Sequence, residues 1–457
     1  MADFDVLILG AGSGGYACAL RAAQLGLSVG LVEKGKLGGT CLHEGCIPTK
    51  ALLHAAEVAD AAREAGQFGV RATFEGIDME AVHAYKDGVV GRLHKGLSGL
   101  VSSRGITLVE GEGRVTGPLT VTVGDTAHTG THLVLASGSS ARSLPGLEVD
   151  GVRVLTSDHA LRLDRVPSSA IVLGGGVIGC EFASVWRSFG ADVTILEALP
   201  HLVPPEDEAS SKALERAFRK RGIAFRTGTA FESVTETETG VAVTVAGGDV
   251  LEAELLLVAV GRGPSTSGLG FEEAGVAMER GFVVTDERLR TSLPHTYAVG
   301  DIVPGLQLAH RGFQQGIFVA EEIAGLAPAP IDESAIPRVT YSHPEVASVG
   351  LTQAQAVERH GAEAVTATTY DLGGNGKSQI LKTQGFVKLV ALTDGQVVGI
   401  HLVGDRVGEL IGEAQLIYGW EAHADDVAPL VHAHPTQTEA LGEAHLALAG
   451  KPLHAHS

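Results

Sequence analysis

The stretch Val6-Leu7-Ile8-Leu9-Gly10-Ala11-Gly12-Ser13-Gly14-Gly15 decides the fold of this chain. An apolar run with the character of a buried strand leads directly into the pattern Gly-x-Gly-x-x-Gly. In dinucleotide-binding units the first glycine allows a tight turn, the second lets the backbone approach a diphosphate, and the third lets helix and strand pack closely. The N-terminus of the following helix attracts the diphosphate. The stretch therefore predicts a strand, a turn and a helix that bind a dinucleotide.

The same unit occurs a second time. Residues 170–179 read Ala-Ile-Val-Leu-Gly-Gly-Gly-Val-Ile-Gly, with glycines at the positions that match the first copy. The next predicted strand ends in an acidic residue in both copies, Glu33 and Glu197, at the same distance from the first glycine. A carboxylate at this position accepts hydrogen bonds from a ribose hydroxyl. Because strand, glycines and acidic residue agree twice, a chance glycine-rich turn is the weaker interpretation.

Three further apolar runs extend the α/β pattern. Residues 132–136 and 255–260 each read as the last strand of their unit and lead into a glycine turn. Residues 296–301 form another predicted strand, which ends in Asp301. A carboxylate there lies at the strand end where ligands of open α/β sheets bind.

The character of the chain changes after about residue 335. Two apolar runs, 386–392 and 396–402, flank Asp394-Gly395, which is a hairpin signal. Helical patterns follow at 407–420 and 436–449. The predicted fold class is therefore α/β, with two Rossmann-like dinucleotide-binding domains and a C-terminal α+β domain.

A pair of cysteines stands just before a strong helix signal. Residues 38–50 read Gly-Gly-Thr-Cys-Leu-His-Glu-Gly-Cys-Ile-Pro-Thr-Lys, which places Cys41 and Cys46 five positions apart. Pro48 suits a first helical position, and the expected helix runs from Lys50 to about residue 65. A helix N-terminus lowers the pKa of a thiol, so this pair can cycle between dithiol and disulfide. A buried structural pair and a metal site are the alternatives; zinc would need two more soft ligands, and no second cysteine pair exists, so no metal is predicted.

Composition excludes several classes of protein. The 457 residues carry 34 Lys and Arg against 54 Asp and Glu, a formal charge of −20, which argues against nucleic acid and anionic membranes as partners. Four cysteines do not make a secreted disulfide framework. Asp3 and Asp5 stand where a signal peptide needs basic residues, and no apolar run approaches the roughly 20 residues of a membrane span. We expect a soluble, cytoplasmic protein.

Two dinucleotides and one dithiol point to a flavin, which links thiol chemistry to nicotinamide. The chain resembles the pyridine nucleotide–disulfide oxidoreductases over essentially its whole length, and within them the members that oxidise dihydrolipoyl groups. The motifs that carry the resemblance are residues 38–50, Val299-Gly300-Asp301, Leu308-Ala309-His310, 341–350 and His432-Ala433-His434-Pro435-Thr436-Gln437-Thr438-Glu439.

The resemblance implies a division of labour among domains and cysteines. The first unit, residues 1–147, would bind FAD with the help of residues 271–338. Residues 148–270 would bind NAD, and residues 339–457 would form a dimer interface. Cys46 would face the flavin and Cys41 the substrate. Lys50 would lie near the reactive flavin ring, paired with Glu181.

The cofactor contacts implied by the resemblance form two sets. For FAD they are Gly10, Gly12, Ser13, Gly14, Gly15, Glu33, Lys34, Gly39, Thr40, Lys50, Gly113, Ser137, Gly138, Asp301, Leu308, Ala309 and His310. For NAD they are Gly174, Gly176, Val177, Ile178, Gly179, Glu197, Gly261 and Arg262.

A histidine and a carboxylate near the C-terminus form the second chemical element. A base must deprotonate a dihydrolipoyl thiol, whose unperturbed pKa is about 8.5. His434 suits this task if Glu439 orients its far nitrogen, and Pro435 restricts the backbone between them. His432 has no equivalent partner in the sequence and reads as structural, and the last histidines, His454 and His456, read as a solvated tail. The family places His434 on the other subunit of a homodimer.

The resemblance also implies partners and leaves alternatives open. The substrate would be the lipoyl-bearing acyltransferase of a 2-oxoacid dehydrogenase complex or the glycine cleavage carrier. A flavin reductase acting on quinones and a catalytically silent scaffold subunit remain alternatives. NADP-dependent relatives carry arginines after the second acidic position, whereas residues 198–201 here read Ala-Leu-Pro-His. Departures from the family pattern include His43-Glu44, whose carboxylate adds negative charge near the cysteines, together with Ser137 and Gly263.

Overall fold

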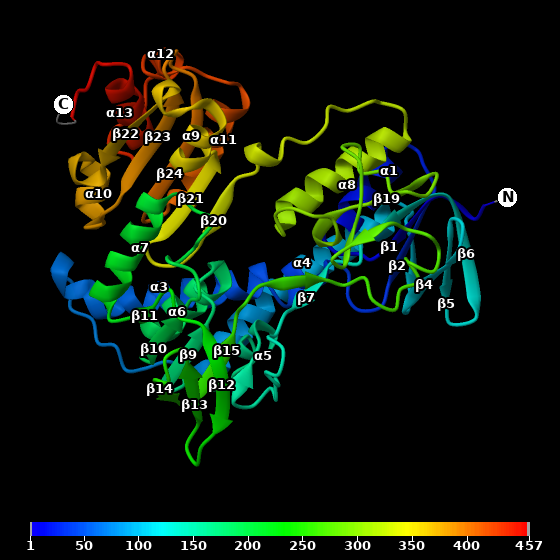
Figure 1. Ribbon diagram of the computed structural model, residues 1–457, viewed down its shortest axis with the longest axis horizontal. Helices are drawn as coiled ribbons and strands as arrows, with labels where there is room; N and C mark the ends of the chain where they lie inside the picture. The colour runs from blue at the N-terminus through cyan, green and yellow to red at the C-terminus, as the bar shows by residue number, and fades with distance from the viewer. Residues whose placement is uncertain (1, 455–457) are drawn as a thin grey trace.

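A computed structural model describes residues 2–454 of the chain. Figure 1 shows three bodies: the first dinucleotide unit beside the N-terminus, the second unit below the centre, and the C-terminal domain at the opposite end. The fold class predicted from the sequence is confirmed. No helix among residues 2–454 is long and apolar enough to cross a membrane.

The first unit is built on a seven-stranded sheet in the order β3-β2-β1-β6-β5-β4, with β19 added beside β6. Its strands are β1 (Phe4–Leu9), β2 (Val29–Glu33), β3 (Thr107–Glu110), β4 (Gly113–Gly117), β5 (Thr120–Val123), β6 (Thr126–Leu135) and β19 (Thr296–Ala298). Strand β6 is thus not at the end of its parallel array, because β19 pairs with it in parallel from far along the chain. The first unit is completed by residues that follow the second unit.

Helices α1 (Ser13–Gln24) and α8 (Ala309–Ile323) cover this sheet and pack closely on each other. A Cβ at Gly316 of α8 would lie 2.3 Å from the carbonyl oxygen of Gly14, so only glycine fits there. A Cβ at Gly15 would lie 1.8 Å from the oxygen of Gly10, which is the close helix–strand approach that the third motif glycine permits.

The second unit repeats this plan with a parallel sheet in the order β11-β10-β9-β15-β8. Its elements are β8 (Val154–Leu155), α5 (Ser157–Ala160), β9 (Ser169–Leu173), α6 (Val177–Phe189), β10 (Asp192–Leu196), α7 (Glu208–Arg221), β11 (Ala224–Arg226), β12 (Phe231–Glu236), β13 (Val241–Val245), β14 (Val250–Ala253) and β15 (Leu255–Val258). Here too the predicted last strand, β15, has an outer neighbour, β8. The short strands β7 (Ser139–Ala141) and β16 (Arg262–Pro264) pair where the chain passes between the units, and β17 (Met278–Glu279) pairs with β18 (Phe282–Val283).

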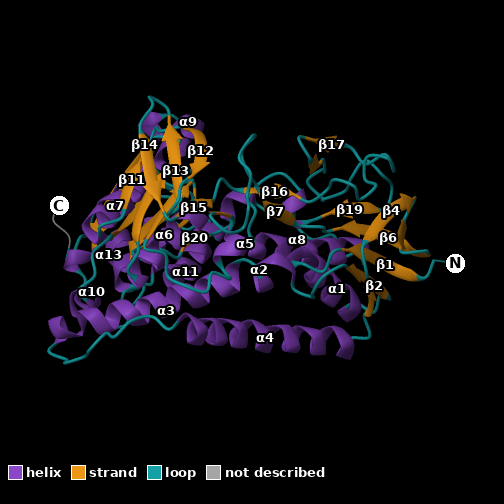
Figure 2. Cartoon of the chain, turned by 90° about the horizontal axis from the view of Figure 1, so that it is seen from below, coloured by secondary structure: helices purple, strands orange, loops and turns teal. Residues whose placement is uncertain are grey.

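Two long helices lie along one side of the molecule, α3 (Cys46–Glu64) and α4 (Met79–Ser103) (Figure 2). The short helix α2 (Gly39–His43) precedes α3, and a 3₁₀ turn at residues 65–68 follows the last residue of α3. Pro48 is the third residue of α3 rather than the first. It is still within the first turn, where backbone N–H groups have no intrahelical partner. Leu52 and Ala56 of α3 share a buried cluster with Phe182 and Trp186 of α6, so α3 joins the two units.

The C-terminal domain is an antiparallel sheet in the order β20-β21-β24-β23-β22 with helices around it. Its elements are β20 (Arg338–Thr340), β21 (Glu345–Gly350), α9 (Gln353–His360), β22 (Val365–Asp371), α10 (Gly376–Leu381), β23 (Phe386–Leu392), β24 (Val397–Gly404), α11 (Val407–Gly419), α12 (Ala424–Val427) and α13 (Glu439–Leu448). The hairpin predicted at Asp394-Gly395 is confirmed, with Gly395 at φ +99°. Helix α13 begins at Glu439, three residues after the predicted start.

Candidate active site

The two cysteines form a disulfide at the junction of two helices. Cys41 lies in α2, Cys46 is the first residue of α3, and their Cα atoms are 4.7 Å apart. Gly39, at φ +60°, seats this segment on the first dinucleotide turn, because a Cβ there would lie 2.6 Å from the Cα of Gly12. The redox pair is thereby fixed beside the predicted FAD site.

The other two cysteines are buried and free. Burial raises the pKa of Cys18 to about 12 and raises that of Cys180 as well, where the nearby carboxylates of Glu181 and Glu197 add to the effect. Neither thiol ionises near neutral pH, so the disulfide is the redox-active sulfur of the described chain.

A cavity of about 980 Å³ opens at the C-terminal edge of the first sheet. A volume of this size suits a large ligand. It is lined by Gly10, Gly12, Glu33, Lys34, Gly39, Thr40, Gly113, Ser137 and Gly138, all of which belong to the predicted FAD set. The members of this set that are not among its lining residues are Ser13, Gly14, Gly15, Lys50, Asp301, Leu308, Ala309 and His310. A ring nitrogen of His310 lies 2.7 Å from the carbonyl oxygen of Pro337.

The polar groups of this cavity fit a dinucleotide. The space where a Cβ of Gly12 would point holds no atom within 4 Å, as a diphosphate approaching the backbone requires. Glu33 is anchored by the N–H groups of Ala11 and Gly35, which donate to its carboxylate at 2.7 Å each. The hydroxyl of Ser137 is buried without a partner among the described residues, and a bound ligand would supply one.

The second unit reproduces the same geometry. Glu197 accepts hydrogen bonds from the N–H groups of Gly175 and Leu199, at 2.7 Å each, and the space beside Gly176 is again open. Arg262, predicted as an NAD contact, donates from its Nε to the hydroxyl of Ser139 at 2.8 Å. The same hydroxyl donates to Asp301 at 2.5 Å. Ser139 therefore ties the two predicted cofactor residues together between the units.

The ion pair predicted between α3 and α6 has close geometry. The Nζ of Lys50 lies 2.8 and 2.9 Å from the two carboxylate oxygens of Glu181. The Glu181 side chain is only 3% exposed, whereas that of Lys50 is 32% exposed. Lys50 lies one helical turn beyond Cys46, so the same end of α3 carries the thiol and the ammonium group.

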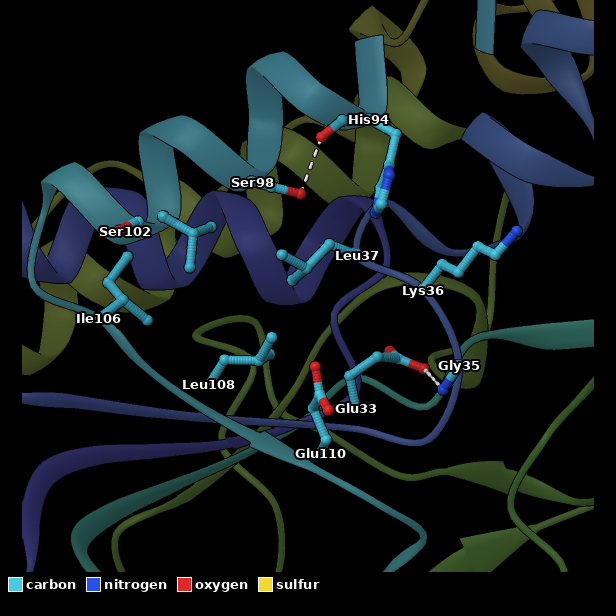
Figure 3. A pocket seen from close by; sticks show the side chains of 11 residues that line it. Glu33, Gly35, Lys36, Leu37, His94, Ser98, Ser102, Ile106, Leu108 and Glu110 are labelled. Atoms are coloured by element: carbon cyan, nitrogen blue, oxygen red, sulfur yellow. Dashed lines mark hydrogen bonds between the residues drawn. The ribbon is translucent and has the colours of Figure 1, made fainter. Parts of the chain in front are cut away.

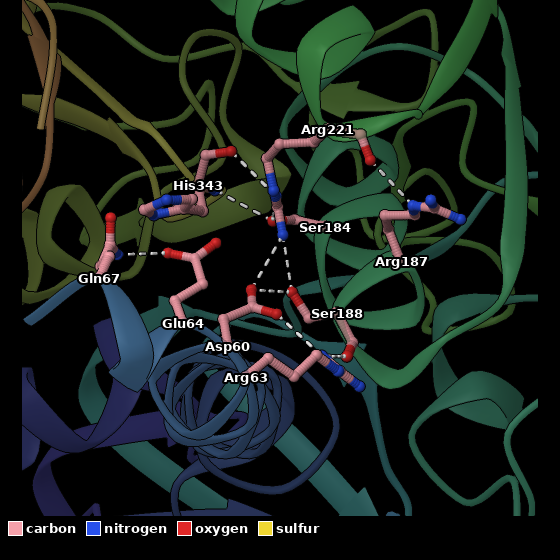
Figure 4. A network of polar contacts seen from close by, with 9 residues as sticks. All are labelled: Asp60, Arg63, Glu64, Gln67, Ser184, Arg187, Ser188, Arg221 and His343. Carbon is pink, nitrogen blue, oxygen red and sulfur yellow. Dashed lines mark hydrogen bonds and ion pairs between the residues drawn. The ribbon is translucent and has the colours of Figure 1, made fainter. Parts of the chain in front are cut away.

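A polar network holds the far half of α3 against the second unit (Figure 4). Arg221, at the end of α7, donates to the hydroxyls of Ser184 (2.7 Å) and Ser188 (2.6 Å) on α6. It also pairs with Asp60 of α3 at 3.2 Å and donates to the carbonyl of His343 at 2.9 Å. One guanidinium group thus joins three parts of the fold and fixes the helix that carries Cys46.

His434 and Glu439 form a hydrogen-bonded pair at the start of α13. Nδ1 of His434 lies 2.8 Å from Oε1 of Glu439, and the N–H of Thr436 donates to Oε2 at 2.8 Å. The His434–Pro435 bond is cis. Burial works to raise the pKa of Glu439, but the hydrogen bonds from Thr436 and His434 outweigh it and lower the pKa, which keeps the carboxylate charged. The imidazole is 76% exposed, so its Nε2 side is available to a substrate or a second copy of the chain.

Three side chains have partners that the sequence did not indicate. His432, which the sequence indicated to be structural, lies with its Nε2 2.7 Å from Glu413 of α11. His454 is not a free tail, because its Nδ1 lies 2.8 Å from the buried Glu443; His456 is outside the described residues. Glu44, which lies between the two cysteines, forms an ion pair with Arg162 that compensates its charge. The partners Glu413, Glu443 and Arg162 lie on other elements of the fold, so no local sequence pattern predicts these contacts.

Helix α4 supplies site residues that the sequence analysis missed. Its Lys86, Val90 and His94 line the large cavity, and His94, Ser98 and Ser102 line a side pocket of about 520 Å³ (Figure 3). Burial, together with the charges of His43 and Lys36, lowers the pKa of His94. These five positions recur every four residues and form one helix face, which is the signal that could have found them.

Comparisons with known proteins identify the family of this chain. Residues 4–316 match the pyridine nucleotide-disulphide oxidoreductase family and residues 336–445 match its dimerisation domain. The chain therefore belongs to the pyridine nucleotide-disulphide oxidoreductase family, in which the dihydrolipoyl dehydrogenases use FAD and NAD(H). Within the family its relatives include dihydrolipoyl dehydrogenases, among them that of Bacillus subtilis, 41% identical over 99% of both chains, and that of Chlorobaculum tepidum, 41% identical over 97% of this chain and 96% of the other.

A solved structure supports the same assignment. The crystal structure of LpdA from Mycobacterium tuberculosis has a TM-score of 0.90 and 28% identity, and covers 97% of this chain and 99% of that one. The family resemblance seen in the sequence is confirmed, and the dimerisation domain indicates a homodimer. Among residues 2–454, no group of three or more His, Cys, Asp or Glu side chains is arranged to hold a metal ion.

Proposed function

We propose that this protein is an NAD-dependent dihydrolipoyl dehydrogenase, which oxidises protein-bound dihydrolipoyl groups to lipoyl groups. The observation that carries the proposal is the Cys41–Cys46 disulfide at the mouth of the first dinucleotide turn, seated there by Gly39 on Gly12. A dithiol substrate exchanges with a protein disulfide through a mixed disulfide. The neighbouring cavity would hold FAD, the acceptor of the electrons.

The substrate side of the reaction begins with proton transfer. His434 accepts the proton of one substrate thiol, and the Glu439 carboxylate stabilises the imidazolium through Nδ1. The substrate thiolate attacks Sγ of Cys41, and the bond between Cys41 and Cys46 breaks, leaving a Cys46 thiolate. The sulfur of the second substrate thiol displaces Cys41 and its proton passes to the departing Cys41 sulfur, which completes the lipoyl disulfide and leaves Cys41 as a thiol. Two electrons and two protons have then passed from substrate to protein.

The chemistry that bound FAD would supply is the acceptance of two electrons from a thiolate and their return to NAD⁺ as a hydride. The contribution of the chain is to hold the parts in place. Lys50 keeps a positive charge one turn from Cys46, where it stabilises the thiolate, and Glu181 holds the ammonium group. Gly12 and Glu33 would hold the diphosphate and ribose of FAD, and Gly176 and Glu197 those of NAD.

NAD is favoured over NADP at the second unit. The carboxylate of Glu197 is held by two backbone N–H groups and is buried, so it would repel a 2′-phosphate. No arginine follows it at residues 198–201 to neutralise such a phosphate.

We infer that the homodimer completes the substrate site. His434 is exposed on the C-terminal domain, and the domain that carries it matches a dimerisation domain. The partner subunit's His434 would then face the Cys41 of each copy. The expected carrier is the lipoyl-bearing acyltransferase of a 2-oxoacid dehydrogenase complex or the glycine cleavage carrier, and the cytoplasm is the expected compartment.

A steady-state assay with free dihydrolipoamide tests the proposal. We expect turnover with NAD⁺ to exceed that with NADP⁺ at least tenfold in kcat/KM, a difference of about 1.4 kcal/mol or more. Cys46→Ser should abolish turnover of dihydrolipoamide, yet leave NADH-driven reduction of a quinone. Cys18→Ala, a change at a buried free thiol, is the matched control and should retain turnover. Retained dihydrolipoamide oxidation in Cys46→Ser would refute the mechanism.

A further inference from the structure

A third group, from the C-terminal domain, meets the Lys50–Glu181 pair. Tyr341 lies between β20 and β21, and its backbone N–H donates to Oε1 of Glu181 at 3.0 Å. The Nζ of Lys50 also lies 4.8 Å from the centre of the Tyr341 ring. This distance is within the roughly 6 Å range of cation–π attraction. The pair is therefore held by three segments: α3, α6 and the β20–β21 connection.

The ring of Tyr341, rather than its hydroxyl, makes this contact. Its hydroxyl forms no hydrogen bond with any residue between 2 and 454. Burial raises the pKa of the phenol, and the charges of Glu345, Glu181 and Glu409 raise it further, so the ring stays neutral at working pH. A neutral aromatic face attracts a cation because its π electrons give the face a negative electrostatic potential.

The ring has little freedom to move away from Lys50. A Cβ at Gly408 of α11 would lie 3.4 Å from Cε1 of Tyr341, so the helix backbone packs against the ring edge. The N–H of Gly408 in turn donates to Glu345 at 2.8 Å. Lys50, by contrast, has a flexible four-carbon stem and is about one-third exposed, so it needs external contacts to stay in one place.

We propose that Tyr341 is a positioning residue for the redox reaction, which acts through its aromatic face by holding in place the ammonium group of Lys50, one helical turn from Cys46. The inference deepens the proposed function and rests on it. Without the ring, Lys50 keeps Glu181 as a partner but loses the contact that fixes its direction. The Cys46 thiolate then has a less well-placed positive charge beside it and becomes less stable.

The readout is the long-wavelength absorbance that a thiolate beside an oxidised flavin produces when the holoenzyme is partly reduced. We expect Tyr341→Leu to lower this absorbance at neutral pH and to move its titration upward by about half a pH unit to one unit. The charged groups facing Lys50 and the ring, namely Glu181 of α6, Glu345 of β21 and Glu409 of α11, are unchanged in this variant. Tyr341→Phe keeps the aromatic face and should retain the wild-type absorbance.

A shape-conserving change guards against a variant that fails to fold. Replacement of Tyr341 by 3,4,5-trifluorophenylalanine keeps the ring but weakens its attraction for a cation. It should lower the absorbance as Tyr341→Leu does. In a Lys50→Met background, neither change at Tyr341 should have any further effect, because the group being positioned is gone.

The outcomes separate this inference from the proposed function. Equal absorbance in the wild type, Tyr341→Leu and the fluorinated variant would overturn the inference, and so would a loss in Tyr341→Phe as large as that in Tyr341→Leu. Absence of the band in the wild-type holoenzyme would count against the thiolate role of Cys46 itself. Loss in the leucine and fluorinated variants with retention in Tyr341→Phe supports the inference.

Discussion

The two dinucleotide units share their turn geometry but differ in how they are enclosed. Gly10 and Gly174 have φ values of +104° and +109°, and a Cβ at either would strike a carbonyl of the neighbouring strand end at 2.3 or 2.4 Å. In the first unit Gly14 lets α8 pack directly on the motif, and Gly39 covers the turn from the other side. In the second unit Ile178 takes the place of Gly14, and the adjacent Val177 is 41% exposed. The enclosed first turn thus suits a tightly bound cofactor, and the open second turn suits a cofactor that dissociates after each reaction.

The largest expected effect comes from filling the open space in each turn. Gly12→Val should yield protein without bound flavin and without dihydrolipoamide turnover, because the side chain occupies the diphosphate position. Gly176→Val should purify with flavin and raise the KM for NAD⁺ by about 10- to 100-fold, a cost of roughly 1.4–2.8 kcal/mol. The flavin absorbance of the purified proteins and steady-state kinetics check both. Loss of flavin in both variants would show that the units are not independent.

The two halves of the reaction should respond differently to the loss of the base. His434→Gln removes the proton acceptor on the substrate side, and we expect dihydrolipoamide oxidation to fall by about 10²- to 10⁴-fold. Reduction of a quinone by NADH uses the second unit and should persist. Stopped-flow reduction by each substrate separates the two halves, and slow reduction by NADH would place the defect elsewhere.

The tight enclosure of the first unit predicts a stability cost for any added atom. Gly316→Ala places a Cβ 2.3 Å from the backbone of Gly14, and overpacking of this kind costs about 1–3 kcal/mol of unfolding free energy. Gly412→Ala, on the exposed side of α11 with open space around it, is the matched control and should be neutral or slightly stabilising. Thermal unfolding of the holoproteins measures both changes. Equal melting temperatures would contradict the close packing of α8 on α1.

The smallest expected effect is on the pH dependence of stability, at Glu345, where the C-terminal domain lies near α3. Burial raises the pKa of Glu345 to about 7, against the hydrogen bond from Gly408, and the charges of Asp405, Glu409 and Glu57 raise it further. The folded state then binds a proton that the unfolded state has released, so stability falls as the pH rises from about 4.5 through 7.

Glu345→Gln removes this penalty while keeping an acceptor for the N–H of Gly408. At pH 8 we expect its free energy of unfolding to exceed that of the wild type by on the order of 1–2 kcal/mol, after allowance for partial exposure, so it should unfold at a higher temperature. At pH 5 the two proteins should unfold at nearly the same temperature. Melting curves at the two pH values decide. A larger gain at pH 5 than at pH 8 would reverse the assigned direction of the shift.

The contact with the second unit should show the opposite pH response. There Asp207, the residue that caps the N-terminus of α7, accepts a hydrogen bond from Lys388 of β23 at 2.7 Å. Burial works to raise the pKa of Asp207, but the bonds from Lys388 and Gln353 outweigh it and lower the pKa. Stability from this pair is therefore present above the ordinary Asp pKa and is lost as the pH falls below it.

Local sequence patterns predicted the parts of the site that depend on local geometry. The glycines of both turns, Glu33, Glu197 and the cysteine pair are recognisable because a turn or a helix start demands those residue types at fixed spacing. The contacts of Arg262 with Ser139 and of His432 with Glu413 cannot be recognised from the sequence, because in each contact the partner comes from another segment of the chain. Strand β19 was recognised as a strand, but its pairing with β6 is set by tertiary packing rather than by its own residues.

The position of β19 and α8 has a consequence for synthesis. The strands of the second unit are complete by residue 258, but the first unit still lacks β19 at 296–298 and α8 at 309–323. As the chain emerges from its N-terminus, the second unit has all its strands while the first sheet is open on the β6 side. Since α8 also packs on Gly14, the first dinucleotide turn is covered on this side only after the second unit is fully made. The domain that begins the chain is therefore closed after the one inserted into it.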